Sequence, residues 1–255
     1  MTTILQQPSA ARDAHADAAR VEADWKPMYR MGGMAALISI AAIVIAVPIY
    51  LISPPPTTVL DWFTLFHQNA FVGLLDLDLL MLIGIAMSGL IYIALFGALR
   101  RANRPLIALG TIIGLVGVAV YFASNTAFNM LALSGQYDAA TTDAERSQLL
   151  AAGQATLAIW QGSSYDIGYV LGGVAMLIIA VVMLRSAVFG RATGYIGLLT
   201  GALMLIPATA GSVGLVLSLV SLAPALVWDI LIARRLFQLA ASRAKATSVE
   251  AQAAR

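Results

Sequence analysis

Apolar residues in this chain gather in runs of about 17 to 25 positions, and short polar stretches between the runs carry nearly all of the charges. A helix needs about 20 residues to cross roughly 30 Å of hydrocarbon, so each run predicts a membrane-spanning helix. The pattern predicts six spans, at about 31–53, 79–99, 105–124, 165–184, 193–210 and 213–233. We therefore expect an all-α integral membrane protein, built as a bundle of six transmembrane helices.

The basic residues predict the orientation of this bundle. Fourteen of the fifteen Lys and Arg residues precede the first span, follow the sixth, or lie in the second-to-third and fourth-to-fifth loops. Only Arg146 falls on the other face. Because Lys and Arg are retained on the cytoplasmic side, both termini are expected to be cytoplasmic.

The spans leave room for one membrane domain, residues 28–238, with flexible cytoplasmic tails at 1–27 and 239–255. Two outer segments predict short helices at the membrane surface. One follows the proline run at 54–56, which cannot continue a helix. The other begins at Thr142, which forms a capping-box spacing with Glu145.

Small residues recur at the four-residue spacing that lets helices approach closely in lipid. We interpret these pairs as contacts within the bundle rather than as a dimer interface. They are Gly110 and Gly114, Gly168 and Gly172, and Gly197 and Gly201.

Composition excludes several functions. A hydrophobic content of 60% is above the 45–50% or so of soluble domains. The net charge of +2 is spread along one membrane face, so a nucleic-acid partner is not expected. The chain has no cysteine, and its two histidines lie outside the spans, which removes thiolate ligands and a pair of axial haem ligands. No cofactor is predicted, and the absence of enzyme motifs favours a non-enzymatic role.

Several polar residues are predicted to lie at a similar depth, near the outer ends of the spans. Counting helix positions from the inner basic residues brings carboxylates, amides and phenols to one outer rim, where they would form a polar pocket. Acids at helix starts are also stabilised by the helix dipole, so a purely structural role stays open. No metal site is predicted from the two neighbouring aspartates, because side chains at i and i+2 diverge on a helix. The candidate pocket residues are Asp76, Asp78, Tyr121, Asn125, Asn129, Tyr165, Asp166 and Tyr169.

Asp229 lies near the C-terminal end of the last span, where the helix dipole disfavours a negative charge. It should therefore need a partner, and Arg100, Arg101 and Arg185 lie at a similar depth. We expect an ion pair that fixes the last span to the bundle. The alternative is a switch that couples the inner face to movement around Pro224, which is expected to kink the span.

The chain resembles a family of bacterial six-span membrane proteins known as domain of unknown function 4386. The resemblance extends from about residue 28 to 238. It implies a six-helix fold in the bacterial cytoplasmic membrane, and it assigns no activity, cofactor or catalytic residue. The similar stretches include YRMGGMAAL at 29–37, GLLDLDLL at 73–80, ALRRANRP at 98–105, GVAVYFASNTA at 117–127, DIGYVLGG at 166–173 and WDILIARRLF at 228–237.

Three functional hypotheses follow. The first is binding, sensing or passage of a small molecule or lipid at the outer polar rim. The second is a structural or accessory subunit that docks a partner membrane protein. The third is a membrane enzyme that uses the outer carboxylates. A cavity lined by the rim would favour the first or third hypothesis, and a filled interior would favour the second.

Overall fold

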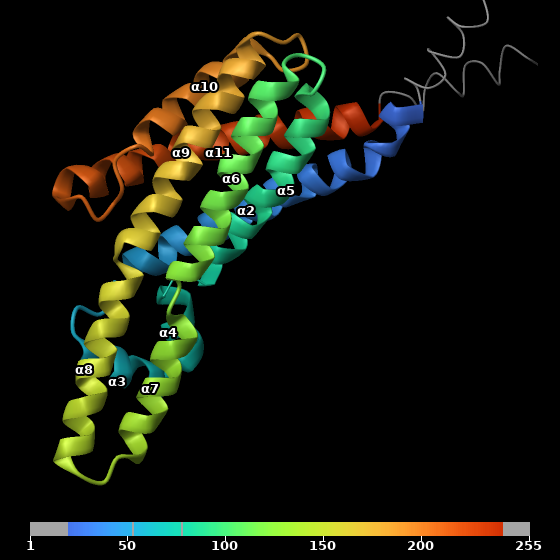
Figure 1. Cartoon of the computed structure of the whole chain (residues 1–255). Helices are drawn as coiled ribbons and strands as arrows, with labels where there is room; N and C mark the ends of the chain where they lie inside the picture. Colours follow the sequence, from blue (N-terminus) through green and yellow to red (C-terminus); the bar gives the residue numbers. More distant parts are fainter. Residues whose placement is uncertain (1–19, 53, 78, 242–255) are drawn as a thin grey trace, which may run out of the picture.

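The computed structural model describes residues 20–52, 54–77 and 79–241 (Figure 1). Asp78 and most of the two predicted tails lie outside the described residues. Within the described part the chain is helical and contains no strand. The all-α membrane bundle predicted from the sequence is confirmed. Its helices are α2 (Lys26–Ile52), α5 (Leu79–Leu99), α6 (Arg104–Ser124), α9 (Ser163–Leu184), α10 (Arg191–Leu203) and α11 (Gly211–Ala241).

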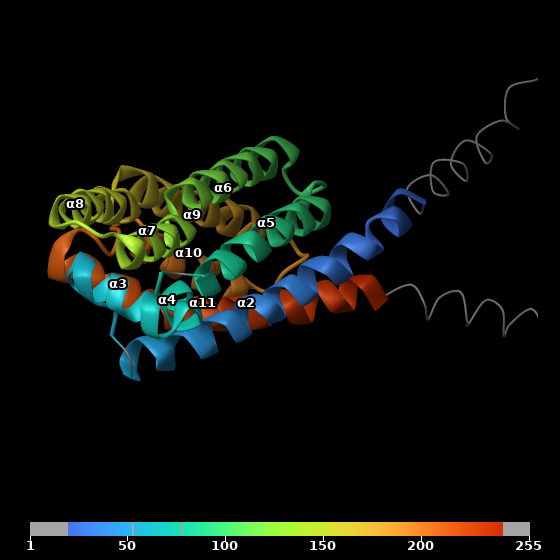
Figure 2. The same ribbon diagram turned by 90° about the horizontal axis from the view of Figure 1, so that it is seen from below.

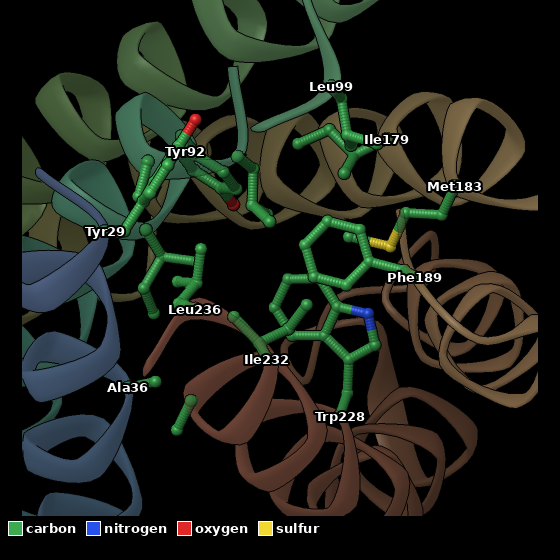
Figure 3. Packing of buried hydrophobic residues seen from close by; sticks show 14 of the residues in the cluster. Tyr29, Ala36, Tyr92, Leu99, Ile179, Met183, Phe189, Trp228, Ile232 and Leu236 are labelled. Atoms are coloured by element: carbon green, nitrogen blue, oxygen red, sulfur yellow. The ribbon is translucent and has the colours of Figure 1, made fainter. Parts of the chain in front are cut away.

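The bundle helices form a closed ring. Each packs against two others in the order α2, α5, α6, α9, α10, α11 and back to α2. The interior of this ring is apolar: Tyr92, Met183, Trp228, Ile232 and Leu236 belong to one buried cluster (Figure 3). Such packing supplies the close van der Waals contact that holds helices together where lipid gives no hydrophobic drive.

Five helical runs of the described chain are long and apolar enough to cross a membrane: Arg20–Tyr50, Leu79–Leu99, Arg104–Ala139, Asp143–Leu184 and Gly211–Ala241. The span predicted at 193–210 is not confirmed, because α10 has only 13 residues, about 20 Å at 1.5 Å per residue. Pro207 lies in the turn that follows α10. Proline lacks an N–H group and disfavours helical geometry at the residue before it, so the helix ends early.

A second group of helices, which we term the outer lobe, projects from one end of the bundle (Figure 1). It consists of α3 (Val59–Gln68), α4 (Ala70–Asp76), α7 (Ala127–Ala139) and α8 (Asp143–Trp160). The lobe has its own apolar core, formed by residues that include Trp62, Phe63, Phe66 and Met130. The capping box predicted at Thr142 and Glu145 is present and begins α8. The two outer helices predicted from sequence are thus parts of one folded unit.

Apart from Arg146, the described basic residues lie toward the end of the molecule away from the outer lobe. The described ends of the chain lie side by side at the end away from α7 and α8 (Figures 1 and 2). Arg100 and Arg101 follow α5 at that same end, whereas Arg146 lies in α8 of the lobe. Most basic residues, which the sequence assigns to one side of the spans, therefore also lie at one end of the structure.

Glycines allow α6 and α9 to meet backbone to backbone. A Cβ added at Gly168 would lie 2.9 Å from the backbone nitrogen of Tyr121 and 3.1 Å from the carbonyl oxygen of Gly117. A Cβ added at Gly117 would lie 3.2 Å from the carbonyl oxygen of Gly168. The close packing predicted for Gly168 is an intramolecular contact, and it fixes the two longest helical runs against each other.

Gly168→Ala should destabilise the protein by about 1–3 kcal/mol, because the added methyl group has backbone atoms in its way and the helices must separate. Chemical or thermal unfolding in detergent measures this loss. Gly135→Ala in α7 is the matched control, since a Cβ there meets no atom within 4 Å. The control should be neutral, or more stable by up to about 1 kcal/mol. Equal effects of the two changes would contradict the close α6–α9 contact.

Candidate functional site

Three of the predicted rim residues form a row of phenol rings between α6 and α9. The ring centroids of Tyr121 and Tyr165 are 5.4 Å apart, and those of Tyr165 and Tyr169 are 6.2 Å apart. The hydroxyl of Tyr169 donates a hydrogen bond of 3.1 Å to Ser218 Oγ in α11. The row thus extends the contact between α6 and α9 toward α11.

The amide and carboxylate groups of the rim are engaged in structural contacts. Asn125 ends α6, and its Nδ2 donates a 2.8 Å hydrogen bond to the carbonyl oxygen of Leu77. The carboxylate of Asp166 accepts a hydrogen bond from the Thr209 hydroxyl, which ties α9 to the turn before α11. Asp76 is fully buried at the end of α4.

The predicted rim therefore converges only in part. Tyr121, Tyr165 and Tyr169 come together, with Asp166 beside them in the first turn of α9. Asn129 is exposed on α7. Asp166 borders a shallow hollow of about 240 Å³ whose other lining residues are apolar side chains of α9. The rim holds the helices together more than it forms a pocket.

A larger hollow, of about 550 Å³, lies in the outer lobe between the segment before α3 and the end of α8. Its volume is within the range of about 300–1,000 Å³ that is typical of small-molecule sites. Aromatic, proline and amide side chains line it, and none of the lining residues is charged. They are Pro55, Pro56, Thr57, Trp62, Gln154, Leu157, Ala158, Trp160 and Gln161.

The lobe positions this hollow by packing two tryptophans edge to face. The ring centroids of Trp62 in α3 and Trp160 in α8 are 6.1 Å apart, with the planes at 80°. Trp62 is buried and forms one wall, while Trp160 is partly exposed. Gln154 and Gln161 extend exposed amides nearby. Such a site offers the partly exposed Trp160 ring for apolar contact and neutral groups that both donate and accept hydrogen bonds.

Sequence reasoning missed this site because its two sides are far apart in the chain. Trp62 and Trp160 come from segments separated by four helices. No local spacing relates them, and only the fold brings the segment before α3 against α8. The available signal was two tryptophans placed near the outer ends of predicted spans, which are equally common as interface anchors.

The inner ion pair predicted for Asp229 is replaced by other contacts. Arg100 and Arg101 each lie within salt-bridge distance of Glu22, at 3.3 and 3.5 Å. The guanidinium of Arg100 also stacks 4.9 Å from the Trp25 ring centroid. Arg185 is exposed at the end of α9. Arg100 and Arg101 therefore bind the segment that precedes α2 instead of Asp229.

Asp229 instead turns into the bundle. Its side chain is hydrogen-bonded to Ser39 of α2, and it lies close enough to Tyr92 of α5 for an electrostatic interaction. The residue is 7% exposed. Asp229 is therefore a buried carboxyl group near two hydroxyl groups, at a position where the sequence had suggested an ion pair between the last span and the bundle.

The family of the chain follows from its sequence. A family model described as a domain of unknown function, DUF4386, matches residues 31–237. The chain belongs to the DUF4386 family. No curated protein and no solved structure shows significant similarity to it. The family match and the apolar helices together make it a multi-pass membrane protein.

Metal chemistry has no obvious site in this DUF4386 protein. Within residues 20–52, 54–77 and 79–241, no three His, Asp or Glu side chains come together as a metal site would require.

Asn125→Ala should lower the free energy of unfolding of the DUF4386 protein by about 1–3 kcal/mol, because it leaves the Leu77 carbonyl without this donor. Unfolding in detergent measures the effect. Asn129→Ala, an exposed position two residues into α7, should change stability by less than about 0.5 kcal/mol. A loss at residue 129 as large as that at residue 125 would contradict the structural role of the Asn125 amide.

Proposed function

We propose that this DUF4386 protein binds an uncharged polar small molecule, or the neutral part of a lipid headgroup, in the hollow of its outer lobe. The observation that supports the proposal is the 550 Å³ hollow beside the paired rings of Trp62 and Trp160. Ligand binding therefore stays the leading function, but the expected binding site is in the lobe and not at the polar rim.

The chemistry of the lining supports the ligand class. No charged residue lines the hollow, so an ionic ligand would lose its hydration without gaining a counter-charge. The partly exposed Trp160 ring can bury an apolar part of a ligand, and glutamine amides and the Thr57 hydroxyl can bond its polar groups. A neutral molecule with both apolar and hydroxyl or amide surfaces fits these groups best.

We place the protein in the cytoplasmic membrane of a bacterium, with both termini inside and the outer lobe outside. The positions of the described basic residues support this orientation, since all except Arg146 lie toward the end away from the lobe. The hollow would then meet molecules arriving from outside the cell or from the outer leaflet. The lipid bilayer is the expected partner of the protein, and a nucleic-acid partner is not expected.

Native mass spectrometry after gentle extraction tests this proposal. The wild type should retain a small-molecule or lipid adduct, and Gln154→Leu with Gln161→Leu should lose most of it, since both amides line the hollow. The fold should be unaffected, because both glutamines are exposed. An adduct that disappears after delipidation and returns with added lipid identifies a headgroup, whereas one that returns only with cell extract identifies a soluble molecule.

Gln148→Leu is the matched control, since it makes the same change at an exposed position of α8 outside the hollow. It should keep the adduct. Loss of the adduct in Asp166→Asn alone would return the site to the polar rim. A wild type without any adduct would contradict ligand binding and favour an accessory subunit, and chemical conversion of a bound molecule would favour an enzyme.

A further inference from the structure

Three helices bring polar side chains together inside the apolar bundle. Ser39 of α2, Tyr92 of α5 and Asp229 of α11 are 6%, 7% and 7% exposed. Tyr92 belongs to the same buried cluster as Trp228, the residue before the aspartate (Figure 3). Nothing in the ligand-binding proposal uses this cluster, which lies in the bundle and not in the outer lobe.

The cluster lies within the membrane-spanning part of its helices. Asp229 precedes Arg234 by five residues, about 7.5 Å along α11. Tyr92 precedes Arg100 by eight residues, about 12 Å along α5. Because arginines mark the boundary of a hydrocarbon layer about 30 Å thick, the carboxyl group lies inside that layer.

The geometry gives the carboxyl group hydroxyl neighbours and no cation. Ser39 forms a hydrogen bond with Asp229, and Tyr92 lies within electrostatic range. Among the residues that the structure describes, the ion pairs of arginine are those of Arg100 and Arg101 with Glu22. Trp228, the residue before Asp229, belongs to the hydrophobic cluster of the bundle interior.

The Tyr92 ring is also held in place. A Cβ added at Gly114 of α6 would lie 2.5 Å from the ring, so the glycine provides the space that the ring occupies. The hydroxyl of Thr111 donates a 3.5 Å hydrogen bond to the Tyr92 carbonyl oxygen. The phenol is thus fixed between α5 and α6, and the carboxyl group meets a preformed polar environment.

A carboxylate with only hydroxyl neighbours in hydrocarbon is costly, and ionisable groups at such depth are usually functional. We propose that Asp229 is an intramembrane proton-binding site, in which the carboxyl group holds a proton at rest and exchanges it with water. On release, the O–H bond of the carboxyl group breaks and the proton passes to water. The carboxylate then accepts a hydrogen bond from Ser39.

The titration belongs to Asp229 and not to another group of the cluster. Ser39 faces it from α2, and Tyr92 from α5, and neither carries a charge near neutral pH. No described arginine or lysine lies within ion-pair distance of the carboxyl group. Protonation should therefore change one charge in an otherwise neutral site.

Infrared difference spectroscopy between acidic and alkaline pH tests this site in vesicles. The wild type should lose a protonated-carboxyl C=O band as pH rises, and Asp229→Asn should lack that band. Ser39→Ala should retain the band at a shifted frequency, because the carboxyl group loses a hydrogen-bond partner. Signals from Asp76, the other buried aspartate of the described chain, are common to wild type and variant and cancel.

Stability supplies the control for folding. Asp229→Asn should leave the melting temperature nearly unchanged, because an amide replaces a neutral carboxyl of the same shape. If that variant fails to fold, the frequency shift in Ser39→Ala still identifies the carboxyl group. Identical difference spectra for the wild type and both variants would overturn the proposal. A wild-type carboxyl group that stays protonated, or stays ionised, at every pH would also overturn it.

Discussion

The close approach of α6 to α9 is the contact on which the rest of the molecule depends. Gly117 and Gly168 leave no side chain between the two backbones. The helical runs that contain them, Arg104–Ala139 and Asp143–Leu184, are the longest in the described chain and continue past the bundle into the outer lobe. In lipid such proximity is stabilised by van der Waals contact, which falls steeply with separation. One glycine contact therefore sets both the packing of the bundle and the direction of the lobe.

The lobe and the bundle interior each contain a different candidate site. In the lobe, α3 is held against α7 by apolar packing and by the His67–Asp138 contact of 2.7 Å. This packing places Trp62 beside Trp160 and leaves a hollow lined by neutral groups. In the bundle, Ser39 and Tyr92 surround a single carboxyl group within apolar packing. The neutral hollow of the lobe suits a small molecule. The buried carboxyl group of Asp229 suits a proton.

Much of the fold was predictable from the sequence, because the bilayer imposes a length and a polarity on each span. The helix expected at 79–99 is α5, and the expected end of α6 at Ser124 is also observed. The span at 193–210 was wrong in length, since hydropathy does not show that Pro207 ends α10. Counting helix positions placed Tyr121 and Tyr165 at a similar depth, and their rings lie side by side. This count could not show that the side chains of Asn125 and Asp166 form hydrogen bonds with Leu77 and Thr209. Those contacts, like the hollow, depend on tertiary packing.

We propose that the outer lobe stands outside the membrane, on the side opposite the basic loops. The chain has no cysteine, so single cysteines report position without further engineering. Gln148→Cys in α8 and Ala102→Cys in the loop after α5 are both exposed positions. In intact cells, a membrane-impermeant maleimide should label residue 148 and reach residue 102 only after the membrane is opened. Labelling of both residues in intact cells, or of residue 102 alone, would contradict this orientation of the protein in the membrane.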